Sequence, residues 1–139
     1  MNYTNDINRL LAVLAEQTDL PVPPLNATGQ CEADLEGTPF LFSYDQERQC
    51  LFILSACGVL DRAEDPDAVL EAVLAANHLW EGTAGGVLGL DEASGCLLLS
   101  YRLDFPLPDE VFPEDLLCEI LPHLRGVSEW CRDLVEPEL

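Results

Sequence analysis

Three short segments in the first half of the chain constrain the fold more than any other feature of the sequence. Residues 30–36 alternate weakly between apolar and polar side chains, residues 39–44 carry Phe40, Phe42 and Tyr44 on one face, and residues 50–57 are strongly apolar. Patterns of this kind predict β-strands. Glu36-Gly37 and the polar residues 45–49 separate the three segments, and connections this short join antiparallel neighbours. We therefore predict a three-stranded antiparallel meander.

Helical periodicity lies on both sides of the meander. A first helix is predicted over residues 5–17, because its apolar residues follow the i, i+3, i+4, i+7 spacing of one helix face. The prolines of residues 21–24 end this helix. A second helix is predicted to begin near Asp65-Pro66, since Asp caps helices and Pro suits the first helical position.

The second half of the chain adds a hairpin and a long helix. Residues 87–90 and 96–104 flank a polar turn and predict a β-hairpin. A last helix is predicted over residues 114–135, with Pro122 and Gly126 expected to bend or split it.

The resulting order is α-β-β-β-α-β-β-α, which predicts an α+β fold. Its sheet should be mostly antiparallel and twisted, flanked by the three helices. A length of 139 residues fits one domain, so residues 1–139 are predicted to form a single domain. Hydrophobic residues make up 48% of the chain, which is enough to build a core and argues against disorder.

The charge balance limits the possible partners. Twenty-six acidic residues stand against six basic ones, for a formal net charge of -20. Such a field repels nucleic-acid phosphates and anionic membranes, whereas it can speed encounter with basic partners. The alternative is that the acidic residues only keep the protein soluble. No signal peptide and no membrane-spanning stretch is apparent, so we expect a cytoplasmic protein.

Little in the sequence indicates catalysis. The two histidines, His78 and His123, have no nucleophile motif near them. Residues 82–86 are glycine-rich but lack the lysine and the following helix of a phosphate-binding loop. The six cysteines form no C-x-x-C pair and have no zinc-finger spacing. We therefore predict reduced, mostly buried thiols, no catalytic or metal-ligating residues, and no cofactor.

A family resemblance is carried by residues 75–91 and 95–103. Ala76-Asn77 ends the second predicted helix, and a small-residue loop and an apolar strand with a turn at Asp91 follow. The strand Leu97-Leu98-Leu99-Ser100-Tyr101-Arg102-Leu103 comes next. This combination resembles the Tir-chaperone (CesT-like) family, the class I chaperones of bacterial type III secretion. Element order, size and acidity extend the resemblance over nearly the whole chain.

The resemblance implies a cytoplasmic homodimer without enzymatic activity. It would bind the non-globular N-terminal segment of a secreted effector and keep it competent for delivery to the secretion apparatus, with the secretion ATPase as a further candidate partner. Two alternatives remain open. One is a regulatory protein that sequesters a transcription factor or another chaperone, and the other is a small hydrolase that uses surface carboxylates.

A dimer interface is predicted on the alanine-rich second helix and on residues 96–104. Apolar side chains are in excess there, and a symmetric pair would use the same patch twice. The predicted interface residues are Val73, Trp80, Leu97, Leu99, Tyr101 and Leu103.

An effector-binding surface is predicted on the first helix and the meander. Exposed apolar patches usually mark binding sites, and an extended peptide can add to a sheet edge. Alternation places Leu41 on the face opposite Phe40 and Phe42, so one face cannot bury all three. The alternative is that all of these residues are core. The predicted residues are Ile7, Leu10, Leu11, Val13, Leu14, Phe40 and Phe42.

Overall fold

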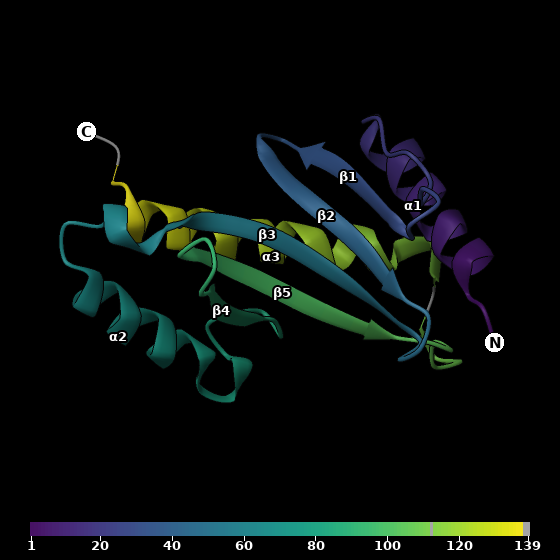
Figure 1. The fold of residues 1–139 in the computed structure, drawn as a ribbon. Helices are drawn as coiled ribbons and strands as arrows, with labels where there is room; N and C mark the ends of the chain where they lie inside the picture. The colour runs from purple at the N-terminus through teal and green to yellow at the C-terminus, as the bar shows by residue number, and fades with distance from the viewer. Residues whose placement is uncertain (112, 138–139) are drawn as a thin grey trace. The chain divides into compact units, whose positions relative to one another are not determined.

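The computed structural model describes residues 1–111 and 113–137, and its elements follow the predicted order (Figure 1). The helices are α1 (Thr4–Thr18), α2 (Pro66–Asn77) and α3 (Pro113–Val135), with 3-10 turns η1 (Leu60–Arg62) and η2 (His78–Trp80). The strands are β1 (Gln30–Leu35), β2 (Thr38–Asp45), β3 (Cys50–Val59), β4 (Val87–Asp91) and β5 (Cys96–Asp104). The predicted α+β order is confirmed.

One five-stranded sheet contains all the strands, in the order β1-β2-β3-β5-β4. The pairs β1–β2, β2–β3 and β4–β5 are antiparallel, which confirms the predicted meander and the predicted hairpin. Because β5 lies beside β3, the hairpin partner β4 is placed at the outside of the sheet. The two sheet edges are therefore β1 and β4.

The turn between β1 and β2 sets the register of the first hairpin. Glu36 and Gly37 have φ values of 53° and 91°, and a two-residue loop with positive φ at both positions matches the twist of the flanking strands. The Gly37 N–H donates to Asp34 Oδ1 at 2.8 Å. Leu35 consequently pairs with Thr38, and the rest of the ladder follows from that pair.

Two compact units make up the chain. The first unit comprises Met1–Leu54 and Arg102–Pro122, and the second comprises Ser55–Tyr101 and the chain from His123 onward. The elements β3, β5 and α3 contribute residues to both units. The single domain over residues 1–139 stays a prediction.

The first unit builds its core from α1 and one face of β1 and β2. Every second side chain of β1 is buried, so that Cys31, Ala33 and Leu35 share the inner face with Phe40 and Phe42. The apolar stripe of α1 is buried as well. Each fully buried side chain of Leu, Ile or Phe contributes about 1.5–3 kcal/mol, so this face supplies much of the stability of the unit.

In the second unit, α2 starts where the sequence predicts. The Asp65 carboxylate accepts a hydrogen bond from the Ala68 N–H at 3.2 Å, and Pro66 occupies the first helical position. Only Val69 and Val73 of this helix are buried. Because small alanines fill much of the remainder, α2 leaves a wide surface exposed.

A small polar cluster lies inside the second unit. The hydroxyls of Ser55 on β3 and Ser128 on α3 are 2.7 Å apart, and Cys57 Sγ lies 3.7 Å from the Ser128 hydroxyl. A hydrogen bond from the Cys131 thiol lowers the pKa of Cys57 to about 7, and the same contact raises the pKa of Cys131. All four side chains are buried, so each hydroxyl needs the partner that it has.

The helix α3 runs from Pro113 to Val135 without interruption. Of the expected bend or split at Pro122 and Gly126, the split is wrong and the bend stays a prediction. Both residues are exposed, whereas Leu121 and Leu124 on the other face are buried. Proline removes one helical hydrogen bond, and burial of the neighbouring leucines outweighs that loss.

Candidate partner-binding surfaces

Most of the residues predicted for effector binding are core residues. Ile7, Leu11, Leu14 and Phe42 are at most 1% exposed, and Leu10 and Phe40 are also buried. The reason is geometric, because the stripe of α1 and the inner face of β2 cover each other. Val13 lies off the stripe and is half-buried, as is Leu41 on the opposite face of β2. Of the predicted set, Val13 retains the most surface for direct contact.

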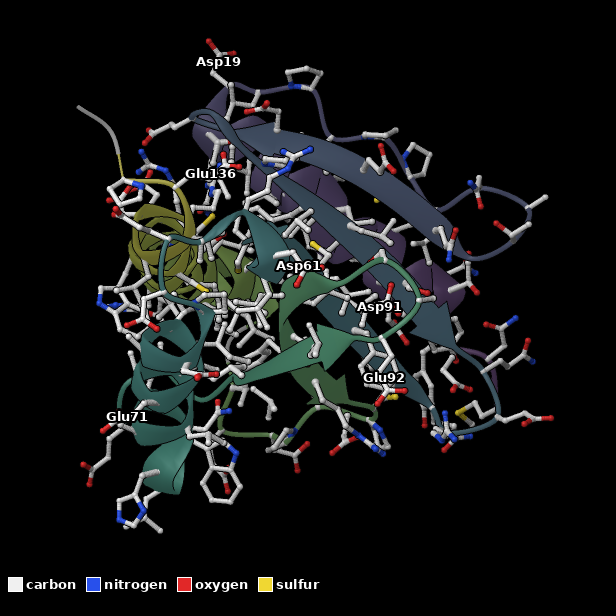
Figure 2. The ribbon with its side chains drawn as sticks, turned by 60° about the vertical axis from the view of Figure 1, so that its left-hand side comes forward. Asp19, Asp61, Glu71, Asp91, Glu92 and Glu136 are labelled. Carbon is white, nitrogen blue, oxygen red and sulfur yellow. The ribbon has the colours of Figure 1, made fainter. Side chains whose placement is uncertain are left out.

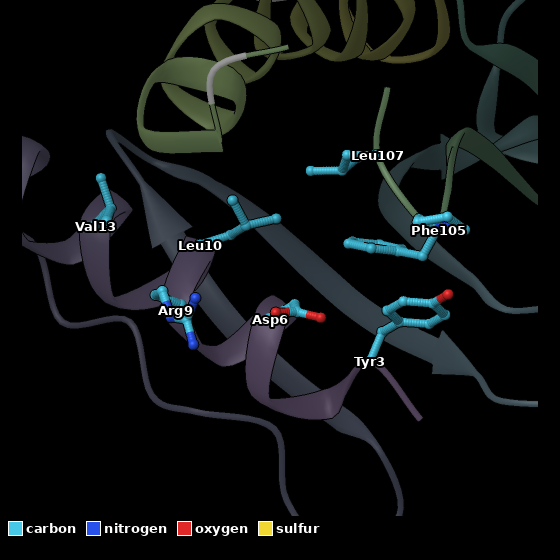
Figure 3. A pocket seen from close by; sticks show the side chains of 8 residues that line it. Tyr3, Asp6, Arg9, Leu10, Val13, Phe105 and Leu107 are labelled. Carbon is cyan, nitrogen blue, oxygen red and sulfur yellow. The ribbon is translucent and has the colours of Figure 1, made fainter. Parts of the chain in front are cut away.

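A pocket of about 320 Å³ opens beside α1 in the first unit (Figure 3). The side chains of Leu10, Phe105 and Leu107 point toward one another across it, and Val13 lines one end. The rings of Tyr3 and Phe105 stack at 5.6 Å between centroids. Asp6 and Arg9 supply one charge of each sign to the lining.

Sequence reasoning missed Tyr3, Phe105 and Leu107 as lining residues of this pocket. In Phe105-Pro106-Leu107-Pro108, each bulky apolar residue is followed by a proline, a pattern that has no helical or strand period. The pattern therefore predicts only a break after β5, and the return of this segment to α1 depends on the tertiary fold.

A second cleft, of about 380 Å³, lies along the outer side of β1. Pro23 and Pro24 form one wall, and Cys31, Glu32 and Leu41 contribute to the other. The proline segment is tied to α1 by a hydrogen bond of 2.9 Å from the Leu25 N–H to Asn8 Oδ1. Because prolines have no N–H, this wall offers few backbone donors to the edge of β1.

In the second unit, large apolar side chains are exposed on α2, η2, β4 and α3. Trp80 is 57% exposed, and the others of this group are Leu74, Leu79, Val87, Leu90 and Trp130. Elsewhere among the described residues, Met1 alone joins them as an exposed large apolar residue. A concentration of this kind is typical of an interaction surface.

The predicted dimer residues divide between this exposed surface and the core. Leu97 and Leu99 are 1% exposed, and Val73 and Leu103 are also buried. The alternation of Leu97, Leu99 and Leu103 identifies the face of β5 that packs inward, and Val73 is buried on α2. These four residues have no surface for a second chain. Tyr101 is half-buried and Trp80 is exposed. Of the predicted interface residues, Trp80 and Tyr101 therefore retain surface for direct contact.

The two exposed residues of the turn η2, Leu79 and Trp80, have an uncommon backbone conformation. Leu79 and Trp80 have φ values of 53° and 59°, which cost about 1–2 kcal/mol per residue outside glycine. The Gly82 N–H donates to the Ala76 carbonyl at 3.0 Å, and a Cβ on Gly82 would lie 2.8 Å from the Ala76 Cα. This tight return leads the chain from α2 into β4.

Asn77 connects the end of α2 to β4. Its Nδ2 donates to the Leu88 carbonyl at 2.8 Å, and the Leu88 N–H donates to its Oδ1 at 2.9 Å. The amide side chain thus satisfies both backbone groups of one strand residue, as a neighbouring strand would. A small residue at Ala76 allows the close approach of Gly82.

Catalytic geometry is not apparent in the described residues. The glycine-rich loop is closed internally, because Thr83 Oγ1 donates to the Gly86 carbonyl at 2.6 Å. Within residues 1–111 and 113–137, no group of three or more His, Cys, Asp or Glu residues could hold a metal ion. No described helix is long and apolar enough to cross a membrane.

The protein-family comparison identifies the chain. The model of the Tir chaperone protein (CesT) family matches residues 9–130, which is most of the sequence. The chain belongs to the Tir chaperone protein (CesT) family. The resemblance inferred from residues 75–91 and 95–103 is thereby confirmed. A search of curated protein sequences gave no match.

Solved structures share the fold of this CesT-family chain. A chain in the crystal structure of the ExsC-ExsE complex has 20% identity and a TM-score of 0.77, with 100% of both chains covered. A chain of the HopA1-SchA chaperone-effector complex has 21% identity and a TM-score of 0.67, with 98% of each covered. A chain of the ExoU-SpcU complex from the type III secretion system of Pseudomonas aeruginosa has 21% identity and a TM-score of 0.69, covering 95% of this chain and 99% of that one.

Within the CesT-family chain, the structure explains the Ala76-Asn77 pair that marks the resemblance. Asn77 binds β4 through its side chain, and Ala76 accommodates the turn that follows α2. The pair therefore connects the end of α2 to β4.

Proposed function

We propose that this chain is a cytoplasmic chaperone of bacterial type III secretion, without enzymatic activity, that binds the N-terminal segment of a secreted effector. The observation that carries the proposal is the family match over residues 9–130. The HopA1-SchA structure, which has the same fold, is a chaperone-effector complex. Such a chaperone keeps the effector segment non-globular for delivery to the secretion apparatus, where the secretion ATPase is a further candidate partner.

The effector segment is proposed to anchor in the pocket beside α1. Leu10, Phe105 and Leu107 provide an apolar floor, and Val13 extends it along the helix. A volume of about 320 Å³ accommodates one or two bulky apolar side chains of an extended chain. The buried stripe of α1 and the phenylalanines of β2 act indirectly, since they hold the pocket-lining turn of α1 in place.

The chain is proposed to act as a homodimer through the exposed apolar residues of the second unit. Leu74, Trp80, Val87 and Leu90 lie on α2, η2 and β4. A protein with a net charge of -20 repels copies of itself over most of its surface. Self-association therefore favours a surface composed of uncharged apolar side chains.

Co-purification tests the proposed function. The full chain carrying an affinity tag is expressed in its native host, and bound proteins are identified together with the region of each that the chain protects from protease. We expect a secreted protein, protected over its N-terminal segment. The Ala12→Asp variant should retain this partner, and the Val13→Asp variant should lose it. Capture of a folded transcription factor or another chaperone would instead favour a regulatory binding protein.

A further inference from the structure

Two thiols and two hydroxyls meet between β3 and α3 in the second unit. Ser55 and Cys57 are separated by one residue on β3, so their side chains share the inner face of the strand. Ser128 and Cys131 lie three residues apart on α3 and share one face of the helix. All four residues are at most 2% exposed. Strand and helix thus each contribute one hydroxyl and one thiol to the same buried contact.

The two thiols of this cluster touch each other. A hydrogen bond joins the side chains of Cys57 and Cys131, and Cys57 Sγ lies 3.7 Å from the Ser128 hydroxyl. The backbone of β3 also approaches α3 one helical turn beyond Cys131, where a Cβ on Gly58 would lie 3.2 Å from Val135 Cγ1. Close contacts before and after Cys131 on the same helix hold its thiol against β3.

These contacts distinguish Cys57 from an ordinary buried cysteine. Hydrogen bonds from the Cys131 thiol and from the Ser128 hydroxyl lower the pKa of Cys57, although burial acts in the opposite direction. At Cys31, burial acts without such bonds and raises the pKa. The thiolate is the nucleophilic form of cysteine, so the cluster favours the reactive form at one thiol and places a second thiol beside it.

We propose that Cys57 and Cys131 are a site of reversible oxidation, at which a hydroperoxide converts the two contacting thiols into a disulfide that links β3 to α3. The proposal is independent of the proposed function, because it involves no effector. The sulfurs of a disulfide are about 2.05 Å apart, and we expect rotation of the two side chains to close the remaining distance. In a reducing compartment such a bond is transient and responds to oxidants.

The reaction takes place in two steps. The Cys57 thiolate attacks one oxygen of hydrogen peroxide, so that an S–O bond forms, the O–O bond breaks, and hydroxide leaves and is protonated to water. The Cys131 thiol then attacks the sulfur of this sulfenic acid. An S–S bond forms, the S–O bond breaks, and the departing hydroxide takes the Cys131 proton. Two thiols and one peroxide thus give one disulfide and two waters.

Burial of the pair determines which oxidants can reach it. Cys57 and Cys131 are 0% exposed, so the reaction requires a local opening of the packing between strand and helix. A small opening admits hydrogen peroxide, whereas a bulky oxidant such as glutathione disulfide needs a larger one. Cys96 and Cys118 are only half-buried, and these two thiols are therefore the competing sites of oxidation.

Mass spectrometry of the oxidised chain tests the proposal. The reduced full chain, with Cys96 and Cys118 both replaced by Ala, is treated with hydrogen peroxide and digested with trypsin. Cleavage after arginine gives fragments 49–62 and 126–132, and we expect them to be joined with the loss of two hydrogen atoms. Because fragment 49–62 also contains Cys50, sequencing of the joined fragments identifies the linked cysteine. Dithiothreitol should restore the original mass, and glutathione disulfide should form the link more slowly.

Thermal unfolding measures what the link does to the protein. A disulfide between Cys57 and Cys131 closes a long loop and restricts the unfolded chain, so the oxidised protein should melt at least about 5 °C higher than the reduced one. In the same background, Cys57→Ala and Cys131→Ala should each abolish both the link and this shift. Cys31→Ala removes a buried thiol outside the cluster and should retain both.

Three outcomes would overturn the proposal. They are a link from Cys57 to any other cysteine, conversion of Cys57 to its sulfinic acid without a link, and an unchanged mass under conditions that oxidise the urea-unfolded chain. If Cys57→Ala or Cys131→Ala does not fold, the joined fragments and the melting shift of the parent background decide the question without these variants.

Discussion

The two units of this chain differ in the exposure of their large apolar side chains. In the first unit, large apolar side chains of α1, β1 and β2 are buried, and the surface offers the pocket beside α1 and the cleft along β1. In the second unit, α2, η2 and β4 leave Leu74, Trp80 and neighbouring residues exposed. The first unit completes its own core, whereas the second has an apolar surface that another chain can cover.

This difference suggests a division of roles between the units. A surface that stays apolar after folding suits a permanent partner such as a second copy, because its exposure carries an aggregation risk in the free chain. A pocket on a completed core suits an occupant that binds and leaves, because the unit is stable without it. The carboxylates of Asp19, Asp61, Glu71 and Glu136 are exposed, and Figure 2 shows those of Asp19 and Glu71 pointing away from the ribbon.

The largest expected effect is loss of folding when a charge is placed in the core of the first unit. Phe42→Asp places a carboxylate at a position that is 0% exposed, and a buried unpaired charge costs several kcal/mol. We expect the variant to be unfolded by circular dichroism at 25 °C. Leu41→Asp, on the opposite face of the same strand, should stay folded. A folded Phe42→Asp variant with a cooperative melt would show that the α1–β2 core is not required.

The proposed dimer surface should be the next most sensitive. Trp80→Ala removes an exposed aromatic side chain, and central aromatic residues of interfaces commonly contribute about 2 kcal/mol or more. We expect light scattering to show that the dimer dissociation constant rises about 30-fold. Trp130→Ala on α3 is the matched control. Equal weakening by both would extend the interface to α3, and weakening by neither would place it elsewhere.

The pocket beside α1 is tested with Val13→Asp. The charged side chain at the end of an apolar pocket should reduce effector affinity at least about tenfold, since an apolar contact is replaced by an unpaired carboxylate. Titration of the chaperone with the identified effector segment measures this, and the dimer mass should not change. Ala12→Asp, exposed on the same helix, should bind normally. Loss of binding in both variants would indicate a general charge effect.

A smaller effect is expected for the buried hydroxyl pair. Ser128→Ala leaves the Ser55 hydroxyl without its 2.7 Å partner, which costs about 1–3 kcal/mol of unfolding free energy. The double variant with Ser55→Ala should recover part of that loss, because no hydroxyl is then unpaired. Urea unfolding measures all three proteins. Strictly additive losses would contradict a direct coupling of the two serines.

The smallest effect concerns pH. Burial raises the pKa of Cys31 from 9.0 to about 11, so its protonated form is favoured in the folded chain. The resulting stabilisation is fully present below pH 9 and is lost as pH rises toward 11. We expect the Cys31→Ala variant to lose less unfolding free energy over this window than the unsubstituted protein. Parallel pH profiles from urea unfolding would exclude a contribution from this thiol.

The sequence alone determined the element order and the family. Period-3.6 and period-2 patterns are local, and the stripe from Ile7 to Leu14 and the alternation of β1 need no knowledge of the rest of the chain. The same is true of Asp65-Pro66, which begins α2 through a contact three residues away. The CesT resemblance likewise depends on a run of neighbouring residues.

Tertiary structure alone decided which apolar residues remain at the surface. Periodicity shows that Ile7 and Phe42 each lie on the apolar face of their own element. It does not show that these two faces pack against each other, and this packing is what buries both. Phe105 and Leu107 reach α1 through a return of the chain that has no local pattern. Whether a backbone group is open depends on what lies across from it, as Asn77 and Leu88 show. Local interactions therefore specify the elements, and long-range packing specifies the binding surfaces.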